Sequence, residues 1–257
     1  MPNVFVCQSG DDALLRESSS GGVFTHLARS VLSRGGAVFG AAFIGGQCRH
    51  ICARTEEELA PLRGSKYLQS ELGDTFGQAK TLLEQGTPVL FSGTPCQIAA
   101  LAATFGHPNL TTLDLVCHGV PERKAWEAYA ARFPAPPVSA SFRDKTEGWR
   151  RFSVRFTFPG GTEYRKNLTE DPFMRAYLAN LCLRKACHQC KFNTSAKKAD
   201  ITLGDDWGGL LPNTGDKGAS VVLLHTPKGE ALFETVRNAV RAEKTQFAAL
   251  TAANQVL

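Results

Sequence analysis

The sequence has 257 residues, enough for one large domain or two small ones, and its 43% hydrophobic residues can form a sizeable core. No window approaches the roughly 18 consecutive apolar residues of a membrane span, and the N-terminus does not resemble a signal peptide, so we expect a cytoplasmic protein. The net charge of +5 is spread along the chain and does not by itself indicate nucleic-acid binding.

The first part of the chain alternates helical and strand patterns. In chain order the patterns predict a helix over 23–33, a buried strand over 37–44, a short helix that opens with the capping box of Thr55 and Glu58, a helix over 74–84, a strand over 87–91, a helix over 95–105, a strand over 110–116 and a helix over 123–132. This alternation indicates an α/β fold with a mostly parallel or mixed sheet and flanking helices.

The pattern changes after Ala135-Pro136-Pro137, which suggests two parts, 1–134 and 135–257, although one domain with an inserted hairpin is equally consistent. A strand over 152–158 followed by a Pro-Gly-Gly turn predicts that β-hairpin. Beyond it we expect a helix over 171–183, short strands over 201–203 and 220–224, and a helix over 229–243.

Eight cysteines are many for a protein without an export signal, where metal ligands or packing residues are more usual than disulfides. Cys96 falls in the first turn of a predicted helix, behind Thr94 and Pro95, with Gln97 completing a capping box. A helix N-terminus favours a thiolate. Cys117 ends the next predicted strand, and the carboxyl ends of such strands meet at one sheet edge.

Cys187 and Cys190 form a CxxC pair, so four thiolates are available, which suffices for a [4Fe–4S] cluster or for zinc. Spacing alone does not separate these two metals. Four further cysteines have no comparable context, and we interpret them as packing residues: Cys7, Cys48, Cys52 and Cys182. Cys182 also extends the pair to C-x4-C-x2-C, so ligation by it stays an alternative.

Two glycine-containing segments could bind an anion. The segment 18–22, Ser-Ser-Ser-Gly-Gly, precedes a helix and suits either phosphate or simple capping. The loop 63–67, Arg-Gly-Ser-Lys-Tyr, could hold an anionic planar cofactor, or could be a solvated loop. The segments 143–149 and 205–208 carry charged and aromatic residues that are suggestive but do not decide a function.

Seven segments together resemble the beta subunit of the coenzyme F420 hydrogenase/dehydrogenase family, especially its bacterial members. In order they are SSSGGVF, RGSKYLQS, LFSGTPCQI, DLVCHGVP, SFRDKTEGW, ACHQCKF and ADITLGDDWG. The resemblance runs from about residue 4 to the C-terminus. It implies an iron–sulfur flavoprotein that carries FAD and [4Fe–4S] and passes electrons between iron–sulfur centres and a hydride carrier, which is F420 in archaeal members.

The resemblance also implies site residues. The cluster ligands would be Cys96, Cys117, Cys187 and Cys190. The flavin contacts would be Ser20, Gly21, Gly22, Gly64, Ser65, Lys66, Tyr67, Ser92, Gly93 and Thr94. These place flavin binding in 1–134 and the CxxC segment in 135–257. We assign Lys66 the catalytic role of stabilising negative charge on the reduced isoalloxazine or on phosphate.

Many relatives begin with a ferredoxin-like segment, whereas this sequence starts after that point. We therefore expect a separate ferredoxin, or another iron–sulfur carrier, as partner, in a homo- or hetero-oligomer. Lys191, Lys197 and Lys198 either dock such an acidic partner or face solvent. Two rival interpretations are a zinc-stapled binding module without catalysis and a thiol oxidoreductase that uses Cys96 as its nucleophile.

Overall fold

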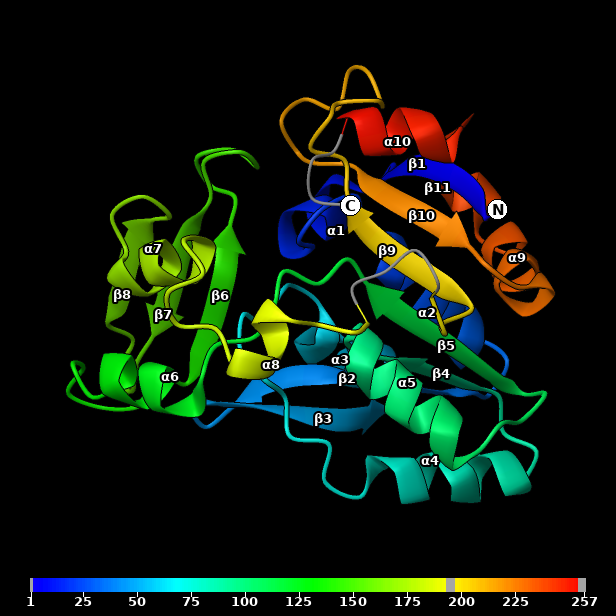
Figure 1. Ribbon diagram of the computed structural model, residues 1–257, viewed down its shortest axis with the longest axis horizontal. Coiled ribbons are helices and arrows are strands. Elements are labelled where there is room, and N and C mark those ends of the chain that lie inside the picture. The colour runs from blue at the N-terminus through cyan, green and yellow to red at the C-terminus, as the bar shows by residue number, and fades with distance from the viewer. Residues whose placement is uncertain (1, 193–196, 254–257) are drawn as a thin grey trace.

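The computed structural model describes residues 2–192 and 197–253 (Figure 1). Its longer strands and helices alternate through the first part of the chain. The strands are β1 (Asn3–Ser9), β2 (Ala37–Ile44), β3 (Gln47–Ala53), β4 (Val89–Ser92), β5 (Leu110–Leu115), β6 (Ser139–Asp144), β7 (Ser153–Thr157), β8 (Glu163–Asn167), β9 (Ile201–Asp205), β10 (Ser220–Leu224) and β11 (Val240–Thr245). The helices are α1 (Asp12–Glu17), α2 (Val23–Leu32), α3 (Glu56–Leu59), α4 (Thr75–Glu84), α5 (Pro95–Thr104), α6 (Arg123–Ala130), α7 (Pro172–Leu178), α8 (Lys185–His188), α9 (Pro227–Glu234) and α10 (Phe247–Ala253), with 3-10 turns η1 (Ala60–Leu62) and η2 (Arg237–Ala239).

The large sheet has eight strands in the order β11-β1-β10-β9-β5-β4-β2-β3. The central strands β2, β4, β5 and β9 are parallel, and their neighbours on both sides are antiparallel. This confirms the predicted α/β fold with a mixed sheet. The predicted hairpin belongs to a separate three-stranded sheet, β6-β7-β8, which lies to one side of the large sheet with α6 and α7 (Figure 1).

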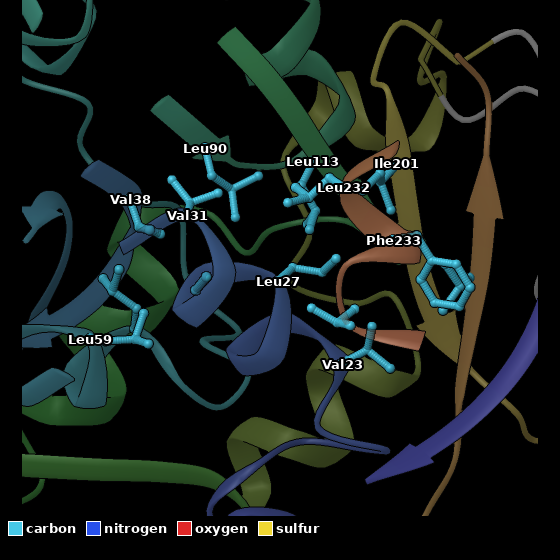
Figure 2. Packing of buried hydrophobic residues seen from close by; sticks show 14 of the residues in the cluster. Val23, Leu27, Val31, Val38, Leu59, Leu90, Leu113, Ile201, Leu232 and Phe233 are labelled. Atoms are coloured by element: carbon cyan, nitrogen blue, oxygen red, sulfur yellow. The ribbon is translucent and has the colours of Figure 1, made fainter. Parts of the chain in front are cut away.

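Helices cover both faces of the large sheet because its central strands are apolar on both sides. On one face, α2 and α9 pack against strand residues that include Val38, Leu90 and Leu113 (Figure 2). The adjacent residues of the same strands, such as Phe39 and Phe91, point to the opposite face and pack against α4 and α5. The sheet is therefore held in place from both sides.

A second, aromatic core joins the small sheet to the β2–β3 edge of the large one. It is made by the inner residues of β6 and β7 together with α6 and α7, and Phe43 of β2 packs against it. Trp126 lies at its centre, with ring centroids 5.3–6.1 Å from those of Phe43, Tyr129, Phe142, Phe156 and Phe173.

Two predicted helices end earlier than expected. The helix predicted over 229–243 is wrong beyond Glu234, because Val240–Thr245 forms β11 and pairs with β1 at the sheet edge. Long-range pairing overrides the local helical pattern there. The helix predicted over 171–183 ends at Leu178, and Asn180 then adopts a left-handed backbone with φ of 61°.

Strands from both sides of residue 135 share the large sheet, and the domain boundary at that point stays a prediction. In the described ranges, no helix is both long and apolar enough to cross a membrane.

Phe156 offers a test of the aromatic core. It is fully buried, with ring contacts to Trp126, Tyr129 and Phe142. Phe156→Ala leaves a cavity there, so we expect the free energy of unfolding to fall by about 3–5 kcal/mol in urea titrations. Val138→Ala, at an exposed position of the same region, should change it by less than about 0.5 kcal/mol. Equal losses for the two variants would contradict this account of the core.

Candidate functional site

A cavity of about 550 Å³ lies at the carboxyl ends of the parallel strands. β4 and β5 are neighbours, and β9 pairs with β5 on its other side. The segments that end or follow these three strands line the cavity together: 92–94, 115–120 and 203–205. This is the position at which open α/β sheets bind ligands.

Most of the residues predicted to contact a cofactor line this one cavity. They come from three separate segments and are Ser20, Gly22, Gly64, Ser65, Lys66, Tyr67, Ser92, Gly93 and Thr94. Gly21 is the predicted residue outside the lining. A Cβ atom at Gly21 would overlap the carbonyl oxygen of Cys7 and would lie 2.6 Å from the amide nitrogen of Ser220. Glycine is needed there for close approach of the backbone of β1 and β10.

The N-terminus of α2 opens at this cavity without a side-chain cap. Its N-cap is Gly22, with φ of 78°, and no side chain accepts a hydrogen bond from the first turn. At the start of α5, in contrast, the predicted capping box of Thr94 and Gln97 is present, with the Thr94 amide donating to Gln97 Oε1 over 2.9 Å. The first turn of α2 therefore retains donors for an anionic group.

Lys66 lines the cavity, but its ammonium group is tied to its own loop. Nζ donates to the carbonyl oxygens of Pro61 and Arg63 over 2.8 and 2.7 Å. An ammonium group has three donors, so one remains. Burial lowers the pKa of Lys66 to about 8, which places its change of charge close to neutral pH.

Arg143 is a buried cation in the cavity lining. Its side chain is 2% exposed, and Nη1 donates to Asp205 Oδ2 over 2.6 Å. The guanidinium carbon lies 4.9–5.4 Å from the ring centroids of Trp149, Phe152 and Trp207. Nε and Nη2 are buried without a hydrogen-bond partner. In Arg29 the same two nitrogens, Nε and Nη2, donate to the Glu56 carboxylate. Nε and Nη2 of Arg143 are therefore suited to bind an anion or a carbonyl oxygen.

The four cysteines predicted as ligands lie in one region beside the cavity. Cys117 lines it, Cys187 is half-buried, and Cys96 and Cys190 are exposed. Burial raises the pKa of the Cys117 thiol to about 11, the Gly119 amide opposes this, and the charges of Cys96, Cys187 and Cys190 raise it further. Thiolates this close repel one another, and a bound metal would relieve the repulsion.

Backbone pairing brings the CxxC segment to Cys117. The Glu122 amide donates to Cys182 O over 2.8 Å and the Arg184 amide donates to Val120 O over 2.9 Å. A Cβ atom on Gly119, whose φ is 132°, would lie 3.3 Å from Cys187 Cβ. The loop after β5 and the segment before α8 are therefore packed together.

No three His, Cys, Asp or Glu side chains in residues 2–192 and 197–253 are arranged to hold a metal ion. Cys7, Cys48 and Cys52 are confirmed as packing residues, since each lies in or against a hydrophobic core. Cys182 packs against the aromatic core.

Several cavity residues lie outside the sequence-based prediction. His50 and Tyr177 carry no motif that marks them, whereas Ser70 and His118 lie in the segments RGSKYLQS and DLVCHGVP without having been predicted as site residues. Arg143 and Asp205 lie in the two segments that the sequence marks as suggestive. In both segments, charged residues lie close in sequence to a tryptophan. This pattern indicates a site only once the structure places β9 beside β5.

The fold and the site define a mixed α/β protein with a ligand cavity beside a group of cysteines. A family model that describes the C terminus of the coenzyme F420 hydrogenase/dehydrogenase beta subunit matches residues 86–249. The match covers more than half of the chain, and the chain belongs to this family.

A similar solved structure comes from the F420-reducing [NiFe] hydrogenase complex of Methanosarcina barkeri, in a study of its xenon derivatization. The TM-score is 0.64 at 17% identity, and the alignment covers 98% of this chain and 87% of that chain. At this identity the likeness establishes the shared fold. No curated protein matches the sequence.

The pair of Arg143 and Asp205 can be tested by stability. Asp205→Ala leaves a buried guanidinium without the carboxylate that pairs with it, so we expect the free energy of unfolding in urea to fall by about 3 kcal/mol. Asp12→Ala breaks an exposed pair with Lys217 and should cost at most about 1 kcal/mol. A loss for Asp205→Ala no larger than that of the control would show that Arg143 does not depend on this carboxylate.

Proposed function

We propose that this chain is an iron–sulfur flavoprotein oxidoreductase of the cytoplasm. It moves electrons between a [4Fe–4S] cluster and FAD, and FAD exchanges a hydride with F420 or another two-electron carrier. The observation that carries the proposal is that one cavity is lined by the three predicted flavin-binding segments and by Cys117, one of four interacting cysteines. Membership in a family of hydrogenase and dehydrogenase subunits supports the same reaction class.

The cavity residues fit a dinucleotide that combines phosphates with a planar ring. The uncapped start of α2 would hold phosphate, with the free donor of Lys66 nearby in the lining. The rings of Tyr67 and Tyr177, stacked with centroids 4.8 Å apart, would form an apolar wall for the ring system. The unpaired nitrogens of Arg143 would bind a carbonyl or anionic edge. When bound, FAD would supply the exchange of single electrons for a hydride.

The cysteines fit a cluster by their chemistry. A single zinc ion requires all four sulfurs at about 2.3 Å from one point, whereas each cysteine of a [4Fe–4S] cluster binds a different iron. The charges of Cys96, Cys187 and Cys190 act on the Cys117 thiol, and four sulfurs suffice for one [4Fe–4S] cluster. Because Cys96 and Cys190 are exposed, a cluster at this position would be reachable by a partner's iron–sulfur centre.

The partner is part of the proposal. We infer a ferredoxin or another iron–sulfur carrier, for which the exposed Lys191 offers positive charge directly after Cys190 and the exposed Lys198 offers further charge. The similar solved chain belongs to a hydrogenase complex, which supports assembly with other subunits.

Cofactor content after purification without oxygen tests the proposal. We expect a flavin absorption spectrum, about one FAD per chain, and iron and sulfide near four atoms each. Cys187→Ser should lose most of the iron because it removes one ligand. Cys52→Ser, at a half-buried position outside the group, should retain iron and flavin as in the unaltered protein.

Three outcomes would overturn parts of the proposal. Absence of both iron and flavin after reconstitution removes it altogether. One equivalent of zinc in a colourless protein supports the binding-module interpretation. Unchanged iron in Cys187→Ser refutes the ligand assignment.

The charge on Lys66 predicts a pH dependence of FAD affinity. The group is protonated below its pKa of about 8 and loses its positive charge as the pH rises through that value. The FAD phosphates keep their charge over this range. We therefore expect the Kd, measured by flavin fluorescence on cofactor-stripped protein, to rise about tenfold between roughly pH 7 and 9.

Two lysine substitutions test whether Lys66 causes the pH dependence of FAD affinity. Lys66→Arg keeps its charge and should flatten the pH profile. Burial also lowers the pKa of Lys145 to about 8, but Lys145 lies outside the lining, so Lys145→Arg should leave the profile unchanged. A profile that Lys66→Arg does not flatten would show that another group titrates.

A further inference from the structure

The loop between β6 and β7 reaches from the small sheet to the segment 18–22 of the cavity. Trp149 of this loop is 3% exposed, and its indole Nε1 donates to the Ser19 carbonyl oxygen over 3.0 Å. Ser18, Ser19 and Ser20 belong to the cavity lining, whereas Trp149 does not. The indole therefore lies behind the lining and acts on a bound molecule through the segment that it holds.

Three contacts hold the indole ring in this orientation. It stacks on Trp207 with ring centroids 4.2 Å apart and ring planes 25° apart. The backbone amide of Trp149 donates to the Asp216 carbonyl oxygen over 2.9 Å. Gly218, whose φ is 88°, packs directly against the ring, since a Cβ atom there would lie 2.6 Å from Cδ1 and Nε1. Only glycine leaves the indole in its place.

The residues that follow Ser19 are bonded to the large sheet. Ser20 Oγ donates to the Ala219 carbonyl oxygen, and the Gly21 amide donates to Ser220 Oγ over 2.9 Å. The bond from Trp149 adds a contact from the small sheet to a segment that is also attached at β10. The backbone of this segment is therefore held from two sides.

The bond to Trp149 fixes the direction of the next amide. The Ser19 carbonyl and the Ser20 N–H belong to one planar trans peptide unit, so they point in opposite directions. With the carbonyl directed at Trp149, the Ser20 N–H points away from the indole. Among the described residues, no atom accepts a hydrogen bond from this amide. It lies shortly before the uncapped first turn of α2, and such consecutive amides form a concavity that binds anions.

We propose that Trp149 is a positioning residue for the phosphate groups of the bound flavin nucleotide. The inference rests on the proposed function. By holding the Ser19 carbonyl, the indole N–H keeps the Ser20 amide directed at phosphate, next to the first turn of α2. Trp149 thereby favours a flavin that carries phosphate over riboflavin, which has the same ring system and no phosphate.

Preorganisation is the physical basis of this role. Without the indole N–H, the Ser19 carbonyl loses its donor and the peptide unit can rotate. A donor that is already oriented costs nothing to order when a ligand binds, whereas a mobile one must be ordered first. The loss falls on phosphate affinity, because the proposed wall for the ring system is formed by Tyr67 and Tyr177.

Trp149→Phe in the cofactor-stripped protein tests the role. Phenylalanine keeps an aromatic ring against Trp207 but has no N–H. We expect the Kd of FAD, measured by flavin fluorescence, to rise about tenfold, and the Kd of riboflavin to change by less than about twofold. Calorimetric titration with inorganic pyrophosphate, in the absence of any flavin, should show a similar loss of about tenfold.

Trp126→Phe is the matched control. Trp126 is 7% exposed and also donates its indole N–H to a loop carbonyl, that of Gly46 over 2.9 Å, but it lies outside the cavity lining. The variant loses the same kind of hydrogen bond at a different place. The Kd values of FAD, riboflavin and pyrophosphate should therefore equal those of the unaltered protein.

Gly218→Ala perturbs the same contact with the tryptophan still present. Its methyl group would displace the indole from Ser19, so it should reproduce the selective loss of FAD and pyrophosphate affinity. Circular dichroism shows which variants are folded, and this second variant decides the question where Trp149→Phe does not fold.

An equal rise in Kd for FAD and riboflavin would show that Trp149 supports the fold alone, and would overturn the inference. Unchanged affinity for FAD and pyrophosphate in a folded variant would overturn it as well. Unaltered protein that binds no flavin would instead overturn the proposed function, while the pyrophosphate titrations would still decide whether Trp149 positions an anion site.

Discussion

The parallel pairing of β4, β5 and β9 is the constraint on which the site depends. In register, Ser92 of β4 lies beside Leu113 of β5, and Leu115 of β5 lies beside Leu203 of β9. The three strands therefore end together, and the loops that follow them emerge at one edge. Helices packed on both faces hold this register, because a slip of one residue would exchange the residues that face α2 with those that face α4 and α5. The cavity is thus a consequence of the sheet core, and Val23, Leu62 and Leu113 belong both to that core and to the cavity lining.

The groups gathered at this edge are of two kinds. The cysteines would be stabilised by a bound cation, and the cavity residues would be stabilised by a bound anion. The charges of Cys96, Cys187 and Cys190 disfavour the Cys117 thiolate, and a bound cation would relieve this repulsion. Arg143 with two unpaired nitrogens, the uncapped start of α2 and the lowered pKa of Lys66 mark places where an anion would be stabilised. The cationic core of an iron–sulfur cluster would stabilise the thiolates, and the two phosphates of a neighbouring dinucleotide would pair with the donors of the cavity. This complementarity of sign is a stronger argument for the proposed cofactors than any one of the segments, since each of them alone has an ordinary structural explanation.

Local signals predict those parts of the fold that depend on local interactions. The strand over 37–44 and the capping box at the start of α5 are as the sequence indicates, because burial on both sides and capping are local requirements. The local pattern of the edge strand β11 predicts helix instead, since its pairing with β1 bridges more than 230 residues of sequence. For the site, cysteines and glycine-containing segments can be recognised by motif. His50 cannot, because β3 follows a two-glycine turn and has no strand signal of its own, and its hydrogen-bond partners Ser70 and Ser92 come from two other segments.

Under the proposed function, the positions of these groups would separate the route of electrons from the site of hydride exchange. The cysteines reach the surface at Cys96 and Cys190, where an electron carrier can approach without entering the cavity. Leu68, Ser70 and Gln97 line both the first cavity and a second one of about 710 Å³. Under the proposed function, the first cavity would hold the flavin and the molecule that exchanges hydride with it. Keeping electron entry apart from the cavity would have a physical advantage, because water admitted freely to a reduced flavin would expose it to side reactions.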